Sequence, residues 1–126
     1  MAKIIATEKA PVAIGPYSQA MVVGNLVYTS GQIGINPASG TIEASGIKEQ
    51  TEQVMKNLGE VLSAAGTSFE HAVKTTCFIA EIADFAAFNE IYAEYFTGKP
   101  ARSCVAVKDL PKGALVEVEV VAEIPE

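Results

Sequence analysis

The chain has 126 residues, of which 49% are hydrophobic, and its mean hydropathy is +0.26. Nine lysines and arginines face fifteen aspartates and glutamates, which leaves a formal net charge of −6. This acidic balance argues against nucleic acid as a partner, because phosphate backbones are bound by basic surfaces. The sequence contains neither a polybasic segment nor a long apolar segment, so it does not predict membrane association.

The first third of the chain is typical of strands separated by turns. Lys3 to Thr7 and Ser18 to Val23 are expected strands, with a proline-containing loop between them. Gly24-Asn25 predicts a hairpin turn into a return strand from Leu26 to Ile33, because glycine adopts positive φ at little cost. Gly31, near the end of that strand, indicates a bulge or a close approach of the backbone to another group.

Two helices follow from the spacing of apolar residues. The first is expected from Ile47 to Ala65, with Ser45 as its N-cap and Gly66 just after its end. Its apolar residues form one stripe, so it should lie on a flat surface. The second is expected from Phe85 to Phe96, capped by Asp84, and its aromatic stripe is typical of a core.

Three more strands are expected in the second half. Ala72 to Ala80 is rich in β-branched residues, as central strands are, and Ala101 to Val107 follows the second helix. Leu115 to Ile124 alternates, with valines on one face and three glutamates, Glu117, Glu119 and Glu123, on the other. Those glutamates indicate either a solvated face or the lining of a wet cavity.

This order of elements predicts one domain, residues 1–126, with an α+β fold. Both helices should pack on one face of a mixed sheet, and the last strand is expected to pair with the strand that carries Arg102. The other face would present apolar residues such as Val27 or Tyr28. We expect that face to be buried between subunits.

Arg102 is the only arginine, and it lies in an apolar run. Two interpretations stay open: a planar, bidentate donor that binds a carboxylate, or a structural arginine that is salt-bridged or covers apolar surface with its stem. Cys104 lies two residues further along the strand, so the two side chains should point to the same face.

The two cysteines, Cys77 and Cys104, are far apart and each lies in an apolar run. They are expected to be buried free thiols of a reducing compartment. The first residues lack the long apolar core of a signal peptide, so the cytoplasm is the expected location.

Several catalytic motifs are missing from the sequence: the phosphate-binding loop, the dinucleotide fingerprint, the nucleophile elbow and any cluster of metal ligands. The only histidine, His71, stands at an element boundary, which is typical of a surface residue. Catalysis is therefore expected to need no metal, cofactor or covalent nucleophile. The remaining groups suit recognition of a small carboxylate and activation of water.

The sequence closely resembles the RidA family of reactive-intermediate deaminases, also called the YjgF family, over essentially the whole chain. The motifs that carry the resemblance are Ala13-Ile14-Gly15-Pro16-Tyr17-Ser18-Gln19, Thr29-Ser30-Gly31-Gln32-Ile33, Val73-Lys74-Thr75-Thr76, Asp84-Phe85 with Asn89, Pro100-Ala101-Arg102-Ser103, Leu110-Pro111 and Val116-Glu117-Val118.

Members of that family resemble chorismate mutase in fold and form homotrimers, with sites in the clefts between subunits. They hydrolyse 2-imino acids, which pyridoxal-phosphate enzymes release as enamines, to 2-oxo acids and ammonia. The resemblance implies the same fold, assembly and reaction here. The expected substrates are 2-iminobutanoate and 2-iminopropanoate, with no cofactor.

The resemblance also implies roles for individual residues. Arg102 would bind the substrate carboxylate, while the backbone carbonyl of Cys104 and the side chain of Glu117 would hold the attacking water. Four further residues would line or complete the pocket: Tyr17, Ser30, Gly31 and Asn89.

One departure from the family pattern is the connection of residues 97–99, which is shorter than in many members and bears on the mouth of the cleft. Other functions stay open: a translation-inhibiting endoribonuclease, a non-catalytic 2-oxo acid binder or regulatory partner, and a chaperone-like protein. The acidic charge and the lone histidine argue against the first, and the presence of Arg102 argues against the second.

Overall fold

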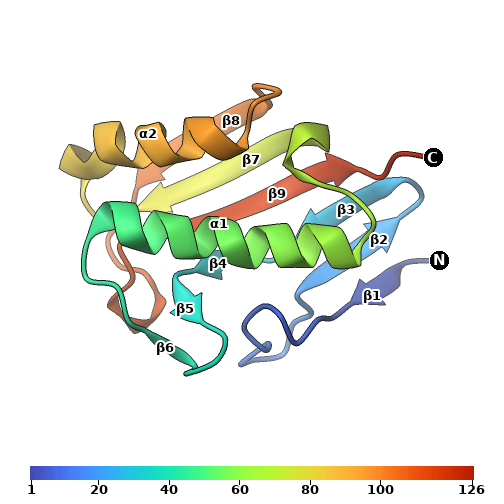
Figure 1. Ribbon diagram of the computed structural model, residues 1–126, viewed down its shortest axis with the longest axis horizontal. Coiled ribbons are helices and arrows are strands. Elements are labelled where there is room, and N and C mark those ends of the chain that lie inside the picture. The colour runs from blue at the N-terminus through green and yellow to red at the C-terminus, as the bar shows by residue number, and fades with distance from the viewer.

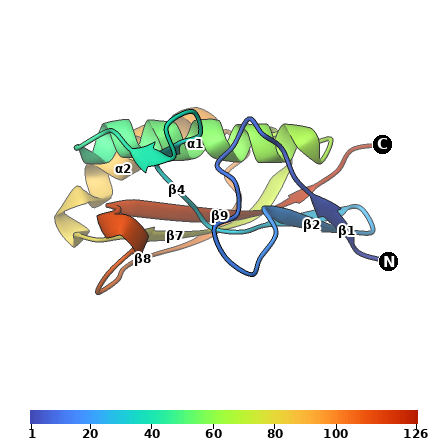
Figure 2. The ribbon, with the colours of Figure 1, turned by 90° about the horizontal axis from the view of Figure 1, so that it is seen from below.

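The computed structural model describes residues 1–126 and shows two helices lying across one face of a sheet (Figures 1 and 2). The helices are α1 (Ile47–Ala64) and α2 (Phe85–Tyr95). The strands are β1 (Lys3–Ile5), β2 (Ala20–Val23), β3 (Leu26–Thr29), β4 (Gln32–Ile33), β5 (Ile35–Asn36), β6 (Thr41–Ile42), β7 (Ala72–Ile79), β8 (Ala101–Ala106) and β9 (Val116–Glu123). This layering confirms the α+β fold with both helices on one side.

The main sheet has the strand order β1-β2-β3-β9-β7-β8, and β4 also pairs with β9. β7 and β8 are parallel because α2 connects them, and such a crossover places the second strand beside the first. The expected pairing of the last strand with the arginine strand is therefore wrong: β7 lies between β9 and β8. The small sheet of β5 and β6 was not expected either.

Register decides which side chains share a face of the sheet. Thr75 is the cross-strand partner of both Arg102 and Val120, so all three point toward the helices. Phe78 is the cross-strand partner of Glu117. Glu117 alternates with the buried valines of β9, so it points to the other face of the sheet. Arg102 thus lies on the helix face, and Glu117 lies on the opposite face.

The helix face holds the core. α1 buries Val54, Met55, Leu58, Val61 and Leu62 completely against the sheet, as its apolar stripe predicted. Neither helix combines the length and hydropathy that crossing a membrane requires.

The helix ends match the expectations in part. The N-cap of α1 is Gly46, whose carbonyl accepts the first helical hydrogen bond from Gln50, so the expected cap at Ser45 is wrong. The Gln50 side chain also donates to the carbonyl of Ala44, so this bond ties the loop before α1 to the first turn of the helix. Gly66 follows the helix at φ 89°, as expected for the residue after a helix end.

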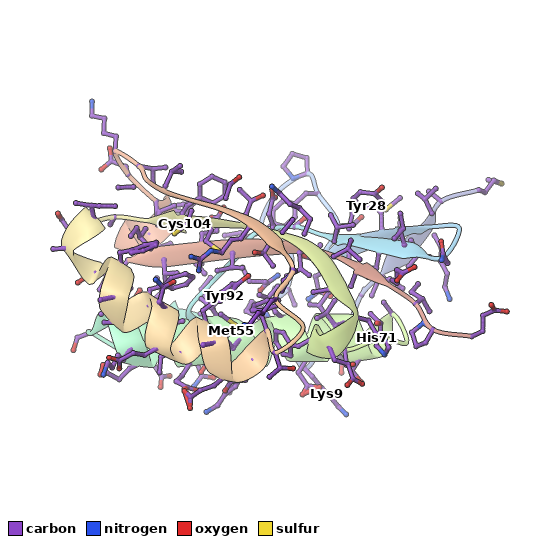
Figure 3. The ribbon with its side chains drawn as sticks, turned by 90° about the horizontal axis from the view of Figure 1, so that it is seen from above. Lys9, Tyr28, Met55, His71, Tyr92 and Cys104 are labelled. Atoms are coloured by element: carbon purple, nitrogen blue, oxygen red, sulfur yellow. The ribbon has the colours of Figure 1, made fainter.

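Two burial expectations need correction. Val27 is fully buried beneath the helices, whereas its neighbour Tyr28 is 47% exposed on the opposite face, where Figure 3 shows it pointing away from Tyr92. Both cysteines are free, but only Cys77 is buried. Cys104 is half-buried because β8 is an edge strand, with no neighbour on its outer side.

Candidate active site

The first group of site residues lies between β8 and α2. The Nη1 of Arg102 donates a hydrogen bond to Asn89 Oδ1 at 2.7 Å. Its guanidinium carbon lies 4.7 Å from the ring centroid of Tyr92 and 5.5 Å from that of Phe85. Such contacts hold a cation through the ring electrons. Phe85, Asn89 and Tyr92 recur at helical spacing, so one face of α2 provides all three contacts.

Tyr92, which sequence reasoning assigned only to the core, contacts the Arg102 guanidinium and lines the cavity beside it. Its hydroxyl forms a 2.7 Å hydrogen bond with the buried hydroxyl of Thr75, the cross-strand partner of Arg102. This bond fixes the ring that supports the guanidinium. The sequence signal for this contact is that Tyr92 lies three residues after Asn89, on the same face of the helix. That signal becomes informative only when the strand that carries Arg102 is known to lie under this helix.

Arg102 forms no ion pair. The salt bridges of the chain join Lys48 to Glu90 and His71 to Glu70. The interpretation of Arg102 as a salt-bridged structural residue is therefore wrong. A half-buried cation held by an amide and two aromatic rings remains available to an anion. A cavity of about 350 Å³ adjoins it.

Cys104 points to the same face as Arg102, as expected, because Cys77 is its partner on β7. Burial raises the pKa of the Cys104 thiol, although the nearby Arg102 opposes this. Burial also raises the pKa of Cys77 to about 12. Both thiols are therefore protonated at neutral pH, so neither supplies a thiolate nucleophile.

The second group of site residues lies on the other face of the sheet, around Glu117. A Cβ atom added to Gly31 would lie 2.5 Å from Glu117 Oε2, so any side chain at this position would displace the carboxylate. The close approach expected at Gly31 is confirmed. Glu117 and Gly31 line a cavity of about 160 Å³ together with Tyr17, so the wet-cavity interpretation of this glutamate fits.

The environment of Glu117 favours its protonated form. Burial raises the pKa of its carboxyl group, and the negative charge of Glu119, two residues along the same face, raises it further. A carboxyl group whose pKa lies nearer to neutrality is a better general base than an ordinary one.

The loop around Tyr17 is held by side chains bonded to the backbone. The Oγ of Ser30 donates to the Ser18 carbonyl at 2.6 Å, so this hydroxyl is used to join two chain segments. The buried Gln19 accepts a bond from the Thr7 N–H and donates to the carbonyls of Thr7 and Pro11. Sequence reasoning assigned Gln19 no role, and its only signal was a polar residue beside an apolar strand.

The structure thus separates the expected site residues into two groups. We call them the cationic half, which comprises Arg102, Cys104 and Asn89, and the acidic half, which comprises Tyr17, Ser30, Gly31 and Glu117. The sheet lies between the halves, because Arg102 and Glu117 point to opposite faces. A single chain therefore does not bring the arginine and the glutamate together.

Other candidate chemistry is sparse. His71 is half-exposed on a 3₁₀ turn, with its Nε2 3.6 Å from a Glu70 carboxylate oxygen, which fits a surface residue. No group of three or more His, Cys, Asp or Glu side chains is placed to hold a metal ion.

Comparisons with known proteins match nearly the whole chain. The family described as Endoribonuclease L-PSP matches residues 7–124. The AldR protein of Lactococcus lactis, named as a regulator, is 52% identical over 97% of this chain and 98% of its own. The 2-iminobutanoate/2-iminopropanoate deaminase of Rattus norvegicus is 51% identical over 95% of this chain and 88% of its own.

A solved structure agrees with these sequence matches. A Rid family protein from Yersinia pestis, YyfA, superposes with a TM-score of 0.95 at 51% identity, over 98% of this chain and 100% of its own.

Proposed function

This chain belongs to the Rid family, whose family description is endoribonuclease L-PSP, and on that premise we propose that it is a 2-iminobutanoate/2-iminopropanoate deaminase. The reaction adds water to a 2-imino acid and yields a 2-oxo acid and ammonia. The relatives that bear this enzyme's name are about half identical to the chain over nearly its full length.

The observation that carries the proposal is the unpaired guanidinium of Arg102. Asn89 and two aromatic rings hold it on the helix face, and no carboxylate of the chain neutralises it. A substrate carboxylate would supply the missing anion through two parallel hydrogen bonds. Asn89 already occupies one side of the guanidinium, so the substrate would take the remaining donors.

The chemistry then needs a positioned water molecule and a base. A protonated imine is electrophilic at C2, where the water oxygen attacks while the Glu117 carboxylate takes a proton from it. The Glu117 carboxyl then returns that proton to the nitrogen of the resulting 2-amino-2-hydroxy acid. Ammonia leaves as the C2 hydroxyl gives its own proton to the Glu117 carboxylate, so the hydroxyl oxygen becomes the 2-oxo group, and the proton then passes from Glu117 to solvent. The Cys104 carbonyl would hold the water, and Gly31 would leave room for Glu117 and offer its N–H.

The separation of the two halves supports a site shared between subunits. We propose a homotrimer with a chorismate-mutase-like arrangement, in which the cationic half of one chain meets the acidic half of the next. The sheet face away from the helices exposes apolar side chains, including Tyr28 and Val105, which a subunit contact would cover. Tyr17, which is 47% exposed, would then close the cleft.

We also propose that nucleic acid is not a partner of this protein. The family description mentions an endoribonuclease, yet the chain has a net charge of −6 and its single histidine lies on a surface turn. Two free thiols support a reducing compartment such as the cytoplasm.

An imine-hydrolysis assay tests the deaminase proposal. Threonine dehydratase generates 2-iminobutanoate in place, and semicarbazide traps the imine that escapes the added protein. Wild-type protein should divert imine from the trap to free 2-oxobutanoate, and Arg102→Ala should lose about 100-fold or more of this activity. A wild-type protein that leaves the trapping rate unchanged would refute the proposal.

A matched variant separates the effect of the positive charge from the effect of the guanidinium's two parallel hydrogen bonds. Arg102→Lys retains a cation but not the bidentate fork, so it should recover little of the activity. Both variants should keep the oligomeric state of the wild type in size-exclusion chromatography.

A further inference from the structure

The cavity beside Arg102 extends beyond the groups that the proposed reaction uses. Its volume is about 350 Å³. The residues that line it come from the second half of α2 and from the short connection to β8: Asn89, Tyr92, Ala93, Phe96, Thr97, Lys99, Pro100 and Arg102. The connection of residues 97–99 thus contributes Thr97 and Lys99 to the cavity wall.

This cavity is cationic within an acidic protein. Its charged lining residues are Arg102 and Lys99, and neither forms an ion pair. Four other cavities of the molecule are each lined by at least one glutamate. A lining that combines two unpaired cations with no carboxylate favours a ligand with more than one negative charge.

The two cationic residues line the same cavity and are close in the chain. Lys99 and Arg102 are three residues apart, so their Cα atoms are at most about 10 Å from each other. The same cavity is lined by Phe96 and Thr97, which supply an apolar ring and one hydroxyl.

The backbone of Lys99 is held in an uncommon conformation. Its φ is 52°, in the left-handed region that favours glycine and asparagine, although the residue is a lysine that precedes Pro100. Its N–H donates to the Phe96 carbonyl at 3.3 Å, and the preceding Gly98 packs closely against the backbone of Glu70. These contacts hold the backbone of the connection in this conformation, at a position where asparagine or glycine would be less costly than lysine.

We propose that the enzyme also accepts 2-imino dicarboxylic acids, with Lys99 as the specificity-determining residue. The substrate's first carboxylate binds Arg102, as in the proposed deaminase reaction on which this inference rests, and the distal carboxylate extends along the cavity to Lys99. The bonds that form and break are those of the same hydrolysis, so the additional carboxylate changes recognition only.

The test compares two imines across a matched pair of lysine variants. Threonine dehydratase supplies 2-iminobutanoate, and glutamate oxidase with catalase supplies 2-iminoglutarate. Lys99→Asn removes the cation in a residue type that tolerates positive φ. Lys112→Asn is the control, because Lys112 is exposed, has φ 57° and does not line the cavity.

Lys99→Asn should lower the ratio of kcat/KM for 2-iminoglutarate to kcat/KM for 2-iminobutanoate about tenfold, and Lys112→Asn should leave the ratio at the wild-type value. Lys99→Glu should lower the ratio further, and added salt should shrink the wild-type ratio. An unchanged ratio in both Lys99 variants would overturn the inference, as would a wild type that hydrolyses 2-iminobutanoate only. A wild type that hydrolyses neither imine would instead overturn the deaminase proposal.

Discussion

The two halves of the candidate site are held in place by different means. In the cationic half, side chains fix a side chain: Asn89 and the rings of Tyr92 and Phe85 hold the guanidinium of Arg102. In the acidic half, the Glu117 carboxylate lies against Gly31, where a side chain would displace it. The cationic half is therefore defined by contacts between side chains, whereas the acidic half depends on the absence of a side chain.

This difference indicates that neither half is a complete site. The cavity beside Arg102 is lined by no carboxylate or histidine that could act as a general base. The cavity beside Glu117 is lined by no lysine or arginine that could bind the substrate carboxylate. In the proposed homotrimer, the association of copies of the chain would bring the two halves together.

Removal of the base should have the largest effect on turnover. Glu117→Gln keeps the size and the hydrogen-bonding capacity of the side chain but removes its ability to accept a proton. We expect kcat to fall about 10³-fold, within the range of general acid–base catalysis. Binding of 2-oxobutanoate, followed by calorimetry, should persist, because the cationic half is intact. Loss of binding together with turnover would mean that Glu117 holds the ligand and does not act as the base.

Crowding of the acidic half should have a smaller effect. In Gly31→Ala the new Cβ would displace the Glu117 carboxylate, and a misplacement of about 1 Å costs about 100-fold in rate. We expect kcat to fall between about 10- and 100-fold with the fold intact, as circular dichroism would show. Gly59→Ala, within α1, is the matched control and should retain wild-type kcat. Equal losses in both variants would attribute the effect to stability.

The smallest expected effect concerns pH. In the proposed mechanism turnover requires the deprotonated form of Glu117, so kcat should decrease as the pH falls through the raised pKa of this group. Glu119→Gln removes a like charge and should lower that pKa. The acidic limb of the pH profile should then shift to lower pH, while kcat at neutral pH stays the same. A limb that stays in place would assign it to a group other than Glu117.

Much of the fold was predictable because it depends on neighbouring residues in the sequence. The apolar stripe of α1 and the alternation of β9 require only local spacing, and both are confirmed. The same is true of Gly31, since an isolated glycine in a strand indicates a close approach. The exact residue at which a helix begins was harder to predict, because it depends on one position and not on a repeated pattern. The N-cap of α1 is Gly46, whereas Ser45 was expected.

The arrangement of the site was not predictable from the same signals. The opposite orientations of Arg102 and Glu117 follow from the place of β7 between β8 and β9, and this order depends on pairing between distant segments. The burial of Val27 has the same origin, because alternation alone does not reveal which face of β3 meets the helices.

Complementation between two inactive chains tests the shared site most directly. Arg102→Ala and Glu117→Gln chains, each bearing a different affinity tag, are unfolded together, refolded in equal amounts and purified through both tags in sequence. If each site takes one half from each of two chains, some clefts of the mixed assemblies combine an intact Arg102 with an intact Glu117.

Random association in equal amounts makes about one quarter of all clefts intact, so the mixture should recover about a quarter of the wild-type activity on 2-iminobutanoate before the tag selection, and at least that share after it. Each variant refolded alone should stay inactive. A mixture as inactive as its components would contradict the account, because it would place both residues in a site built by one chain.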